Sequence, residues 1–156
     1  MHRLRHPGRR AVLTLAIASA LASATAVGAA ERLAGPVPAE VISVIDGDTI
    51  EVSATIWLGQ YVIVGVRIRG IDAPEIKGKC QREKDLAAAA KQKLGSVAAG
   101  TLRLTNIDGD KYFGRVDADV TTENGTDLGA AMLASGLARP YDGDTRASWC
   151  GVASTE

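Results

Sequence analysis

The order in which strand-like and helix-like segments follow one another is the feature of this sequence that most restricts its fold. Three segments rich in β-forming residues come first, at residues 41–45, 49–53 and 61–71. A run of strong helix formers follows at residues 81–99, then β-rich segments at 101–105 and 115–120, and a second helical segment at 127–137. Five strands with a helix between the third and fourth are typical of an OB-type Greek-key barrel. We therefore predict an α+β fold that is mainly β: a five-stranded OB-fold barrel with two to three helices.

Residues 1–30 have the pattern of a signal peptide. Four arginines and no acid precede an apolar, Ala-rich stretch at residues 11–26, and small residues come just before Glu31. A permanent membrane anchor is the alternative, but the stretch ends in small residues and not in a charged cluster, which favours cleavage at about Ala30. We expect residues 31–39 to be a short linker and residues 40–150 a single domain. The protein would be exported, periplasmic or secreted, with no stable membrane association.

Removal of this leader changes the charge balance. The full chain has 18 basic and 18 acidic side chains, and the leader contains four of the arginines and none of the acids. The remainder therefore has 14 basic and 18 acidic side chains, a net charge of −4. Such a chain does not hold nucleic acid by overall positive charge, so a polyanion would have to be attracted by a local patch or by bound cations.

The two cysteines, Cys80 and Cys150, are candidates for a disulfide. In an exported protein a pair of cysteines is more often bridged than free, and this bridge would close a loop of about 70 residues, worth about 4 kcal/mol. Two free thiols remain the alternative, because a sequence does not show how far apart the sulfurs lie. We expect Trp57 and Trp149 to pack against the protein.

Two aspartates mark a candidate metal site. Asp48 lies in an Asp-Gly-Asp turn between the first two strands, and Asp72 ends the strand that contains Arg67. If these strands are neighbours, the two carboxylates converge at one rim of the barrel. Two hard oxygen donors suit Ca²⁺ or Mg²⁺ and not zinc, and both histidines, His2 and His6, lie in the leader.

Glu75 and Arg67 add the groups that phosphoryl transfer needs. Glu75 follows Asp72 by three residues, so it can share the site without binding the metal and act as a general base on a water. Alternating side-chain directions point Arg67 away from the core, where its guanidinium can bind a phosphate. Carboxylates, a metal and an arginine together fit phosphoryl transfer.

At this point four motifs resemble the successive signatures of the thermonuclease (staphylococcal nuclease-like) family. They are Asp46-Gly47-Asp48-Thr49, Val66-Arg67, Asp72-Ala73-Pro74-Glu75 and Asp110-Lys111-Tyr112-Phe113-Gly114-Arg115. They occur in the family's order, with matching spacing in the first three. Residues 132–138 also look like the family's last helix, so the resemblance covers about residues 40–141.

The resemblance implies a calcium site. Asp48 and Asp72 would bind Ca²⁺ through their side chains, and the backbone carbonyl of Ala73 would be a third ligand. The family often has Thr at the position of Ala73, a difference that a backbone ligand should tolerate. Asp46 and Thr49 would support these ligands from behind.

The resemblance also implies a reaction, the hydrolysis of DNA, and of RNA as well, to products with 3′-phosphate ends. Glu75 would activate or orient the attacking water. Arg67 and Arg115 would stabilise the charge on the pentacoordinate phosphate. These three are the expected catalytic residues.

One departure from the family pattern affects Arg115. The family has Tyr-Gly-Arg where this chain has Tyr112-Phe113-Gly114-Arg115. The extra residue would either rotate Arg115 by one strand position or be absorbed as a bulge, and Gly114 favours the bulge. Tyr112 and Tyr141 are candidates for substrate contact.

Two other functions compete with a nuclease. A non-catalytic OB-fold module would bind single strands through basic grooves and aromatic side chains, but here aromatic residues are 4% of the chain and the residual charge is acidic. A secreted structural domain that binds calcium only for stability is the third possibility, which an activity assay distinguishes. We expect a monomer.

Overall fold

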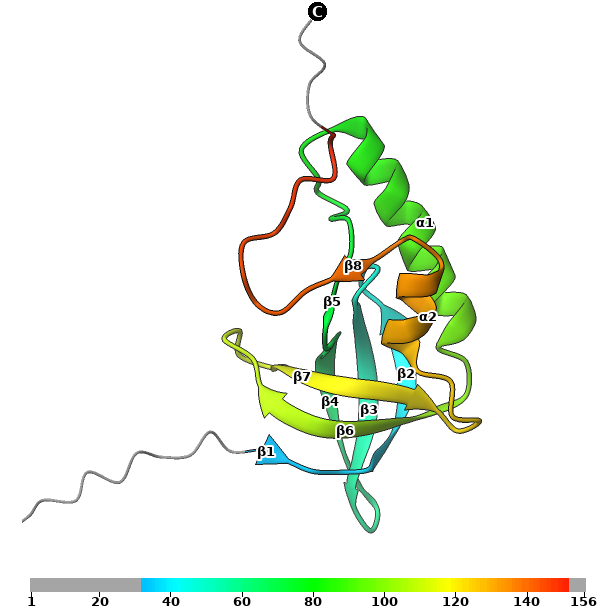
Figure 1. The fold of residues 1–156 in the computed structure, drawn as a ribbon. Coiled ribbons are helices and arrows are strands. Elements are labelled where there is room, and N and C mark those ends of the chain that lie inside the picture. Colours follow the sequence, from blue (N-terminus) through cyan, green and yellow to red (C-terminus); the bar gives the residue numbers. More distant parts are fainter. Residues whose placement is uncertain (1–31, 152–156) are drawn as a thin grey trace, which may run out of the picture.

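A computed structural model describes residues 32–151; the predicted signal peptide lies outside the described residues. Five strands close into a barrel, as predicted (Figure 1). They are β2 (Val37–Val44), β3 (Thr49–Trp57), β4 (Gln60–Ile68), β6 (Thr101–Gly109) and β7 (Arg115–Thr122). Each pairs with the next in the order β2-β3-β4-β7-β6, and β6 returns to β2. The β4–β7 pair is parallel and the other four are antiparallel, so the prediction of an OB-type barrel is confirmed.

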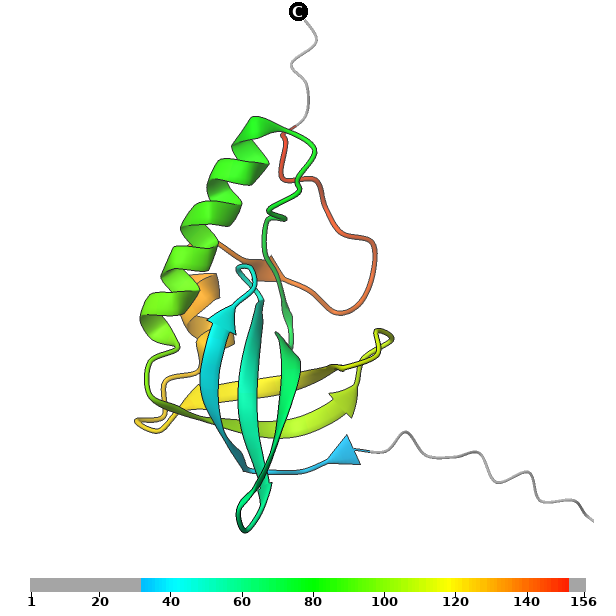
Figure 2. The ribbon, with the colours of Figure 1, turned by 180° about the vertical axis from the view of Figure 1, so that it is seen from behind.

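Within the described residues, two helices and three short strands complete the fold. Helix α1 (Gln81–Val97) lies between the third and fourth barrel strands, and α2 (Leu128–Ala134) follows β7. Strand β1 (Arg32–Leu33) extends the sheet beside β6, while β5 (Ile71–Asp72) pairs with β8 (Arg139–Pro140). The sheet thus includes residues 32–33 and 37–39, which the sequence pattern assigned to a linker. Viewed from behind, β2, β3 and β4 form the near wall of the barrel, with α1 along its upper side (Figure 2).

The barrel interior explains the strand pattern. Along β4, Val66 and Ile68 are buried in the core, while Arg67, and Arg69 just after the strand, are not buried in it, as the alternation predicted. Residues from both helices pack onto this core: Ala90 and Leu94 of α1, and Leu128 and Met132 of α2. Neither helix within residues 32–151 is both long enough and apolar enough to cross a bilayer.

Gly47 lets the turn between β2 and β3 lie directly on α1. A Cβ atom at this position would lie 2.5 Å from the Cβ of Ala90 and 2.7 Å from the Cβ of Ala73. Both distances are shorter than van der Waals contact, so a side chain here would push the turn away from the helix. Glycine is therefore required where the turn that contains Asp46 and Asp48 meets the rest of the protein.

Arg69, just after β4, joins the end of that strand to β6 and β7. Its Nη1 donates to Asp108 Oδ2 over 2.8 Å, and its Nε lies 3.5 Å from Asp119 Oδ1. Arg32 of β1 donates to the other oxygen of Asp108, also over 2.8 Å. Hydrogen bonds from Arg32 and Arg69 lower the pKa of Asp108 to about 2.

The tip of the β3–β4 hairpin is apolar and exposed, and it includes Trp57, which is 72% exposed, and Leu58. The prediction that Trp57 packs against the protein is wrong, because the tip of this hairpin projects beyond the rest of the barrel (Figure 1). Trp149, in contrast, is buried as predicted.

Candidate active site at the barrel rim

A pocket of about 630 Å³ opens at one rim of the barrel, and its lining includes residues of the β6–β7 turn and of the segment after β8. Its charged and aromatic lining residues are Asp46, Glu75, Asp110 and Asp117, then Arg67, Lys111, Arg115 and Arg146, with Tyr112 and Tyr141. A second pocket of about 280 Å³ is lined by Asp72 and Ala73. Glu75 and Arg146 line both pockets, so these two side chains stand between them.

Asp48 is fixed by the residues predicted to surround it. Its side chain is 3% exposed. Oδ1 accepts hydrogen bonds from Thr49 Oγ1 at 2.8 Å and Arg67 Nη1 at 3.0 Å, and Oδ2 accepts one from the Ala73 backbone N–H at 3.1 Å. Asp46 Oδ1 accepts from the Asp48 backbone N–H at 3.1 Å. Burial, and then the charge of Asp48, raise the pKa of Asp46 to about 6.

Asp72 is 4% exposed and ends β5, which β8 holds through the pairing of Asp72 with Arg139. Its Oδ2 accepts a hydrogen bond from the indole Nε1 of Trp149 at 3.1 Å. Its Oδ1 is buried and receives no hydrogen bond of acceptable geometry, although Arg146 Nε lies only 2.6 Å away. A buried carboxylate oxygen without a hydrogen bond is costly unless a cation serves it.

These oxygens fit a hard divalent cation. Asp48 and Asp72 converge at the rim, as predicted, and their donors are carboxylate oxygens, the ligands that Ca²⁺ and Mg²⁺ prefer. The Oδ1 of Asp72, which receives no hydrogen bond, is an oxygen whose charge such an ion could offset. The Ala73 backbone lies beside Asp48 and is buried. The ligand roles of Asp48, Asp72 and the Ala73 carbonyl stay predictions.

Glu75 lies in the loop after Pro74, with a side chain that is 47% exposed. Its backbone oxygen accepts a hydrogen bond from Gly78 N at 2.8 Å, which fixes the loop, and its carboxylate lines the pocket. Oε1 forms an ion pair with Arg146 Nη1. Glu75 therefore shares the site with Asp72, as predicted, and remains the most accessible of the three acids.

The parallel pairing of β4 and β7 places Arg67 and Arg115 on one face. Gly65 pairs with Arg115, and Arg67 pairs with Asp117, so the two arginines lie two positions apart on neighbouring strands. Arg115 forms an ion pair with Asp110, and its guanidinium carbon lies 4.7 Å from the centre of the Tyr112 ring. Both guanidinium groups line the larger pocket.

The extra residue before Arg115 is absorbed in the turn between β6 and β7. Phe113 is fully exposed there, and Gly114 has a φ of +79°, which only glycine adopts easily. The irregularity in β6–β7 pairing lies instead between Thr105 and Asp108. The predicted bulge at Gly114 is therefore wrong, because a turn can take up an added residue without disturbing the ladder.

The two tyrosines that were predicted to contact substrate both line the larger pocket. Tyr141 donates its backbone N–H to Gly70 O at 2.9 Å, and its ring centre lies 5.6 Å from the guanidinium carbon of Arg67. Tyr112 lies against Arg115. Each tyrosine thus flanks one of the two arginines, and their contact with substrate stays a prediction.

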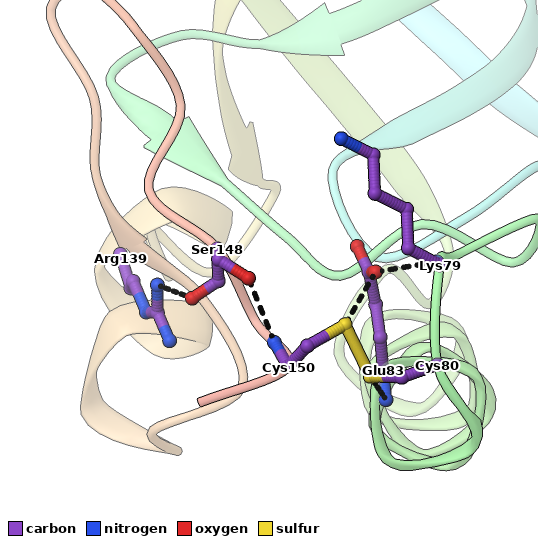
Figure 3. Close-up of a disulfide and its surroundings, with 6 residues drawn as sticks. All are labelled: Lys79, Cys80, Glu83, Arg139, Ser148 and Cys150. Carbon is purple, nitrogen blue, oxygen red and sulfur yellow. Dashed lines mark hydrogen bonds between the residues drawn. A yellow bond between two sulfur atoms is a disulfide. The ribbon is translucent and has the colours of Figure 1, made fainter. Parts of the chain in front are cut away.

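The Cys80–Cys150 disulfide is present and ties the end of the described chain to the start of α1 (Figure 3). Cys80 caps α1 by accepting a hydrogen bond from the Glu83 backbone N–H at 3.4 Å. The Glu83 carboxylate lies beside both sulfurs, but oxidised sulfurs carry no charge or proton, so this group of side chains is not a metal site. We call residues 141–151, which run from β8 to this bridge, the C-terminal strap.

Sequence reasoning missed Arg146 on the strap. Its guanidinium lies within ion-pair distance of Asp48, Asp72 and Glu75. The signal that could have found it was the predicted disulfide: Cys80 lies five residues after Glu75, and Arg146 lies four residues before Cys150. Sequence reasoning also missed Asp117, whose pKa is raised by burial and by Asp110.

Comparison with known proteins relates the chain to one family and to two curated proteins. A sequence model of the family described as "Staphylococcal nuclease homologue" matches residues 65–148. Two curated proteins, one from Escherichia coli and one from Escherichia coli O157:H7, are each 30% identical to the chain over 111 residues. Both are named "Uncharacterized endonuclease". The matched segment is 70% of this chain and 65% of each relative, so it spans slightly less than two thirds of their length.

Proposed function

The chain belongs to the staphylococcal nuclease homologue family, and from that premise we propose that it is a calcium-dependent nuclease that hydrolyses phosphodiester bonds in DNA and in RNA. The observation that supports this proposal is that negatively and positively charged side chains lie next to each other in one site. Buried carboxylates of Asp48 and Asp72 lie on one side, and the guanidinium groups of Arg67 and Arg115 line the pocket beside them. A hard cation and a phosphate need these two kinds of group next to each other.

Asp48, Asp72 and the Ala73 carbonyl would hold the calcium ion. When bound, the ion would supply Lewis-acid chemistry: it lowers the pKa of water and offsets the negative charge of the phosphate. Thr49 supports the site by donating its hydroxyl to Asp48, and Asp46 supports it by accepting from the Asp48 backbone. These contacts hold the Asp48 side chain and its turn in place before any ligand binds.

Glu75 would take the proton from the attacking water or orient that water. It is the acid with the greatest exposure, so solvent and substrate can both reach it. The water oxygen would bond to phosphorus while the bond from phosphorus to the 5′-oxygen breaks, which leaves a 3′-phosphate and a 5′-hydroxyl. This direction of cleavage is proposed on the family resemblance.

Arg67 and Arg115 would bind the non-bridging phosphate oxygens. The extra negative charge that develops on these oxygens during attack then lies beside two guanidinium groups already in position. Arg115 forms an ion pair with Asp110, and Arg67 forms one with Asp48. These ion pairs restrict the positions of the two guanidinium groups. Tyr112 and Tyr141 would contact the nucleotide next to the phosphate.

We also propose that the protein is exported and acts as a monomer. The sequence pattern of residues 1–30 supports export, and the disulfide supports an oxidising compartment. The groups that the proposed site needs are all present in one copy of the chain, so the reaction requires no residue from a second copy.

An activity assay with a matched pair of variants tests the function. Purified protein is incubated with end-labelled single-stranded DNA, duplex DNA and RNA, with calcium or with a chelator, and product ends are identified by phosphatase sensitivity. We expect cleavage with calcium, none with chelator, and 3′-phosphate ends. Glu75→Gln should lower kcat by about a hundredfold or more, while Glu51→Gln, the same change on β3 outside the pocket, should not.

Two outcomes would contradict the proposal. Binding of intact DNA without cleavage, under calcium, would favour the non-catalytic OB-fold module. Cleavage that survives chelation unchanged would show that the carboxylates do not serve a required metal ion.

A further inference from the structure

Arg146 bridges the acids of the proposed site. Its Nε lies 2.6 Å from Asp72 Oδ1, its Nη2 lies 3.7 Å from Asp48 Oδ2, and its Nη1 pairs with Glu75 Oε1. One guanidinium group thus meets all three carboxylates. Its side chain is 38% exposed, so the contacts lie at the mouth of the site and not on the open surface.

The strap holds Arg146 in place from both sides. On one side, Tyr141 donates its backbone N–H to Gly70 O at 2.9 Å. On the other, Arg139 Nη1 donates to Ser148 O at 3.0 Å and Cys150 is bridged to Cys80 (Figure 3). Between them, Trp149 is buried and its indole donates to Asp72. Only two residues separate Arg146 from the buried Trp149. The side chain can therefore turn away from the acids but cannot leave their neighbourhood.

A divalent cation and this guanidinium need the same oxygen. Calcium binds oxygen ligands at about 2.3–2.6 Å, and Arg146 Nε already lies 2.6 Å from Asp72 Oδ1. The approach lacks hydrogen-bond geometry, so the guanidinium serves this oxygen as a nearby charge and not as a well-placed donor. Two cations that repel each other cannot both occupy this position.

We propose that Arg146, paired with Glu75, is a tethered counter-cation that competes with the divalent cation for Asp48 and Asp72, and so sets how much calcium the protein needs. The inference rests on the proposed calcium site. Calcium binding then requires the guanidinium to turn aside. The apparent calcium affinity is the intrinsic affinity multiplied by the fraction of time for which the site is free. A guanidinium that is bound for about nine-tenths of the time therefore weakens calcium binding about tenfold.

Isothermal titration of the metal-free protein with calcium chloride tests the competition directly, without an activity assay. Arg146→Gln removes the charge and keeps much of the side-chain length, so we expect calcium to bind about tenfold more tightly than in the wild type. Arg146→Lys should fall between them, because an ammonium cannot meet three carboxylates as a guanidinium does. Arg103→Gln removes one positive charge from the exposed face of β6 and should leave the affinity unchanged.

Thermal unfolding provides the second measurement and reports folding. In chelator, Arg146→Gln should unfold cooperatively at a lower temperature than the wild type, since three carboxylates lose their partner. With calcium it should show the larger upward shift. Tight binding in the variant therefore cannot be mistaken for a general gain in stability.

The results separate this inference from the function on which it rests. Equal or weaker calcium affinity in Arg146→Gln, in a folded protein whose wild type binds calcium and cleaves DNA, would overturn the competition alone. Absence of calcium binding in the wild type and in every variant would overturn the calcium site and the competition together.

Discussion

The indole N–H of Trp149 donates to Asp72 Oδ2 over 3.1 Å and joins residues 77 positions apart in the sequence. This bond fixes one oxygen of Asp72 and leaves the other, Oδ1, facing Arg146. The C-terminal strap thus helps to shape a carboxylate of the proposed calcium site. Hydrogen bonds to the ligands of a metal ion commonly set their orientation and the affinity of the site.

Trp149→Phe should weaken calcium binding by about tenfold, because it removes the donor to Asp72 and keeps an aromatic ring in the same space. The free energy of unfolding should fall by about 1–3 kcal/mol, as expected for a lost hydrogen bond to a buried charged group. Calorimetric titration and urea unfolding measure the two effects. Trp57→Phe, at the exposed hairpin tip, is the control and should change neither. Unchanged calcium affinity in Trp149→Phe would show that the indole only fills space.

Arg67→Lys should lower kcat by about a hundredfold, because a lysine keeps the charge but loses the forked geometry that serves both Asp48 and a phosphate. Arg69→Lys is a close control: Arg69 lies two residues further along the chain, just after β4, and pairs with Asp108 and Asp119 instead of lining the pocket. Its kcat should stay within a fewfold of the wild type. Steady-state cleavage of a labelled oligonucleotide measures both. Comparable losses in the two variants would mean that the arginines act through stability.

Gly47→Ala should destabilise the protein by about 1–3 kcal/mol, since the new methyl group would overlap Ala73 and Ala90. It should also weaken calcium binding, because the displaced turn contains Asp48. Gly95→Ala in α1 is the matched control: the nearest atom to a new Cβ is 3.7 Å away, so better helix propensity should stabilise the protein by about 0.5–1 kcal/mol. Urea unfolding of both variants measures the difference. A stable Gly47→Ala protein with normal calcium affinity would contradict the packing account.

Replacement of both cysteines by serine should lower the free energy of unfolding by about 4 kcal/mol, the chain-entropy value for a bridge that spans 70 residues. Serine at position 80 can still cap α1, so the comparison isolates the cross-link from the cap. Thermal unfolding of the wild type with and without a reductant provides an independent check. Equal stability of the oxidised wild type and the double variant would show that the bridge does not stabilise the fold.

Asp108→Asn should lower the free energy of unfolding at neutral pH, and the difference from the wild type should disappear in acid. Arg32 and Arg69 lower the pKa of Asp108 to about 2 from 3.8, so the folded protein favours the ionised carboxylate. A lowered pKa contributes stability above pH 3.8 that is lost as the pH falls towards 2. Urea unfolding from pH 7 downwards should show the wild type and variant converging. A constant difference across this range would mean that the effect of Asp108 is not electrostatic.

Much of the fold could be predicted because burial leaves a periodic trace in the sequence. Alternation along β4 marked Val66 and Ile68 for the core and Arg67 for the other face. The Asp-Gly-Asp turn and the order of the elements then brought Asp48 and Asp72 to one rim. The alternation did not show where the β3–β4 hairpin outgrows its neighbours, which is why Trp57 was placed in the protein and is exposed.

The rest of the site could not be predicted because it depends on contacts without a periodic pattern. Arg146 lies in an irregular segment, and only a disulfide and a buried indole direct it to the acids. The turn at Phe113 is similar, since a turn accepts an added residue at no cost to strand pairing. In both places the neighbours that decide the outcome are distant in sequence.

The disulfide also makes a covalent ring of the segment from Cys80 to Cys150, and the parts of the site divide between this ring and the chain before it. Asp48 and Asp72 precede the ring, whereas Arg115 and Arg146 belong to it. A protease that cut the exposed turn at Phe113 would leave one cysteine on each fragment. The acids and the arginines would then remain one covalent molecule, so a nicked chain keeps every component of the site until the bridge is reduced.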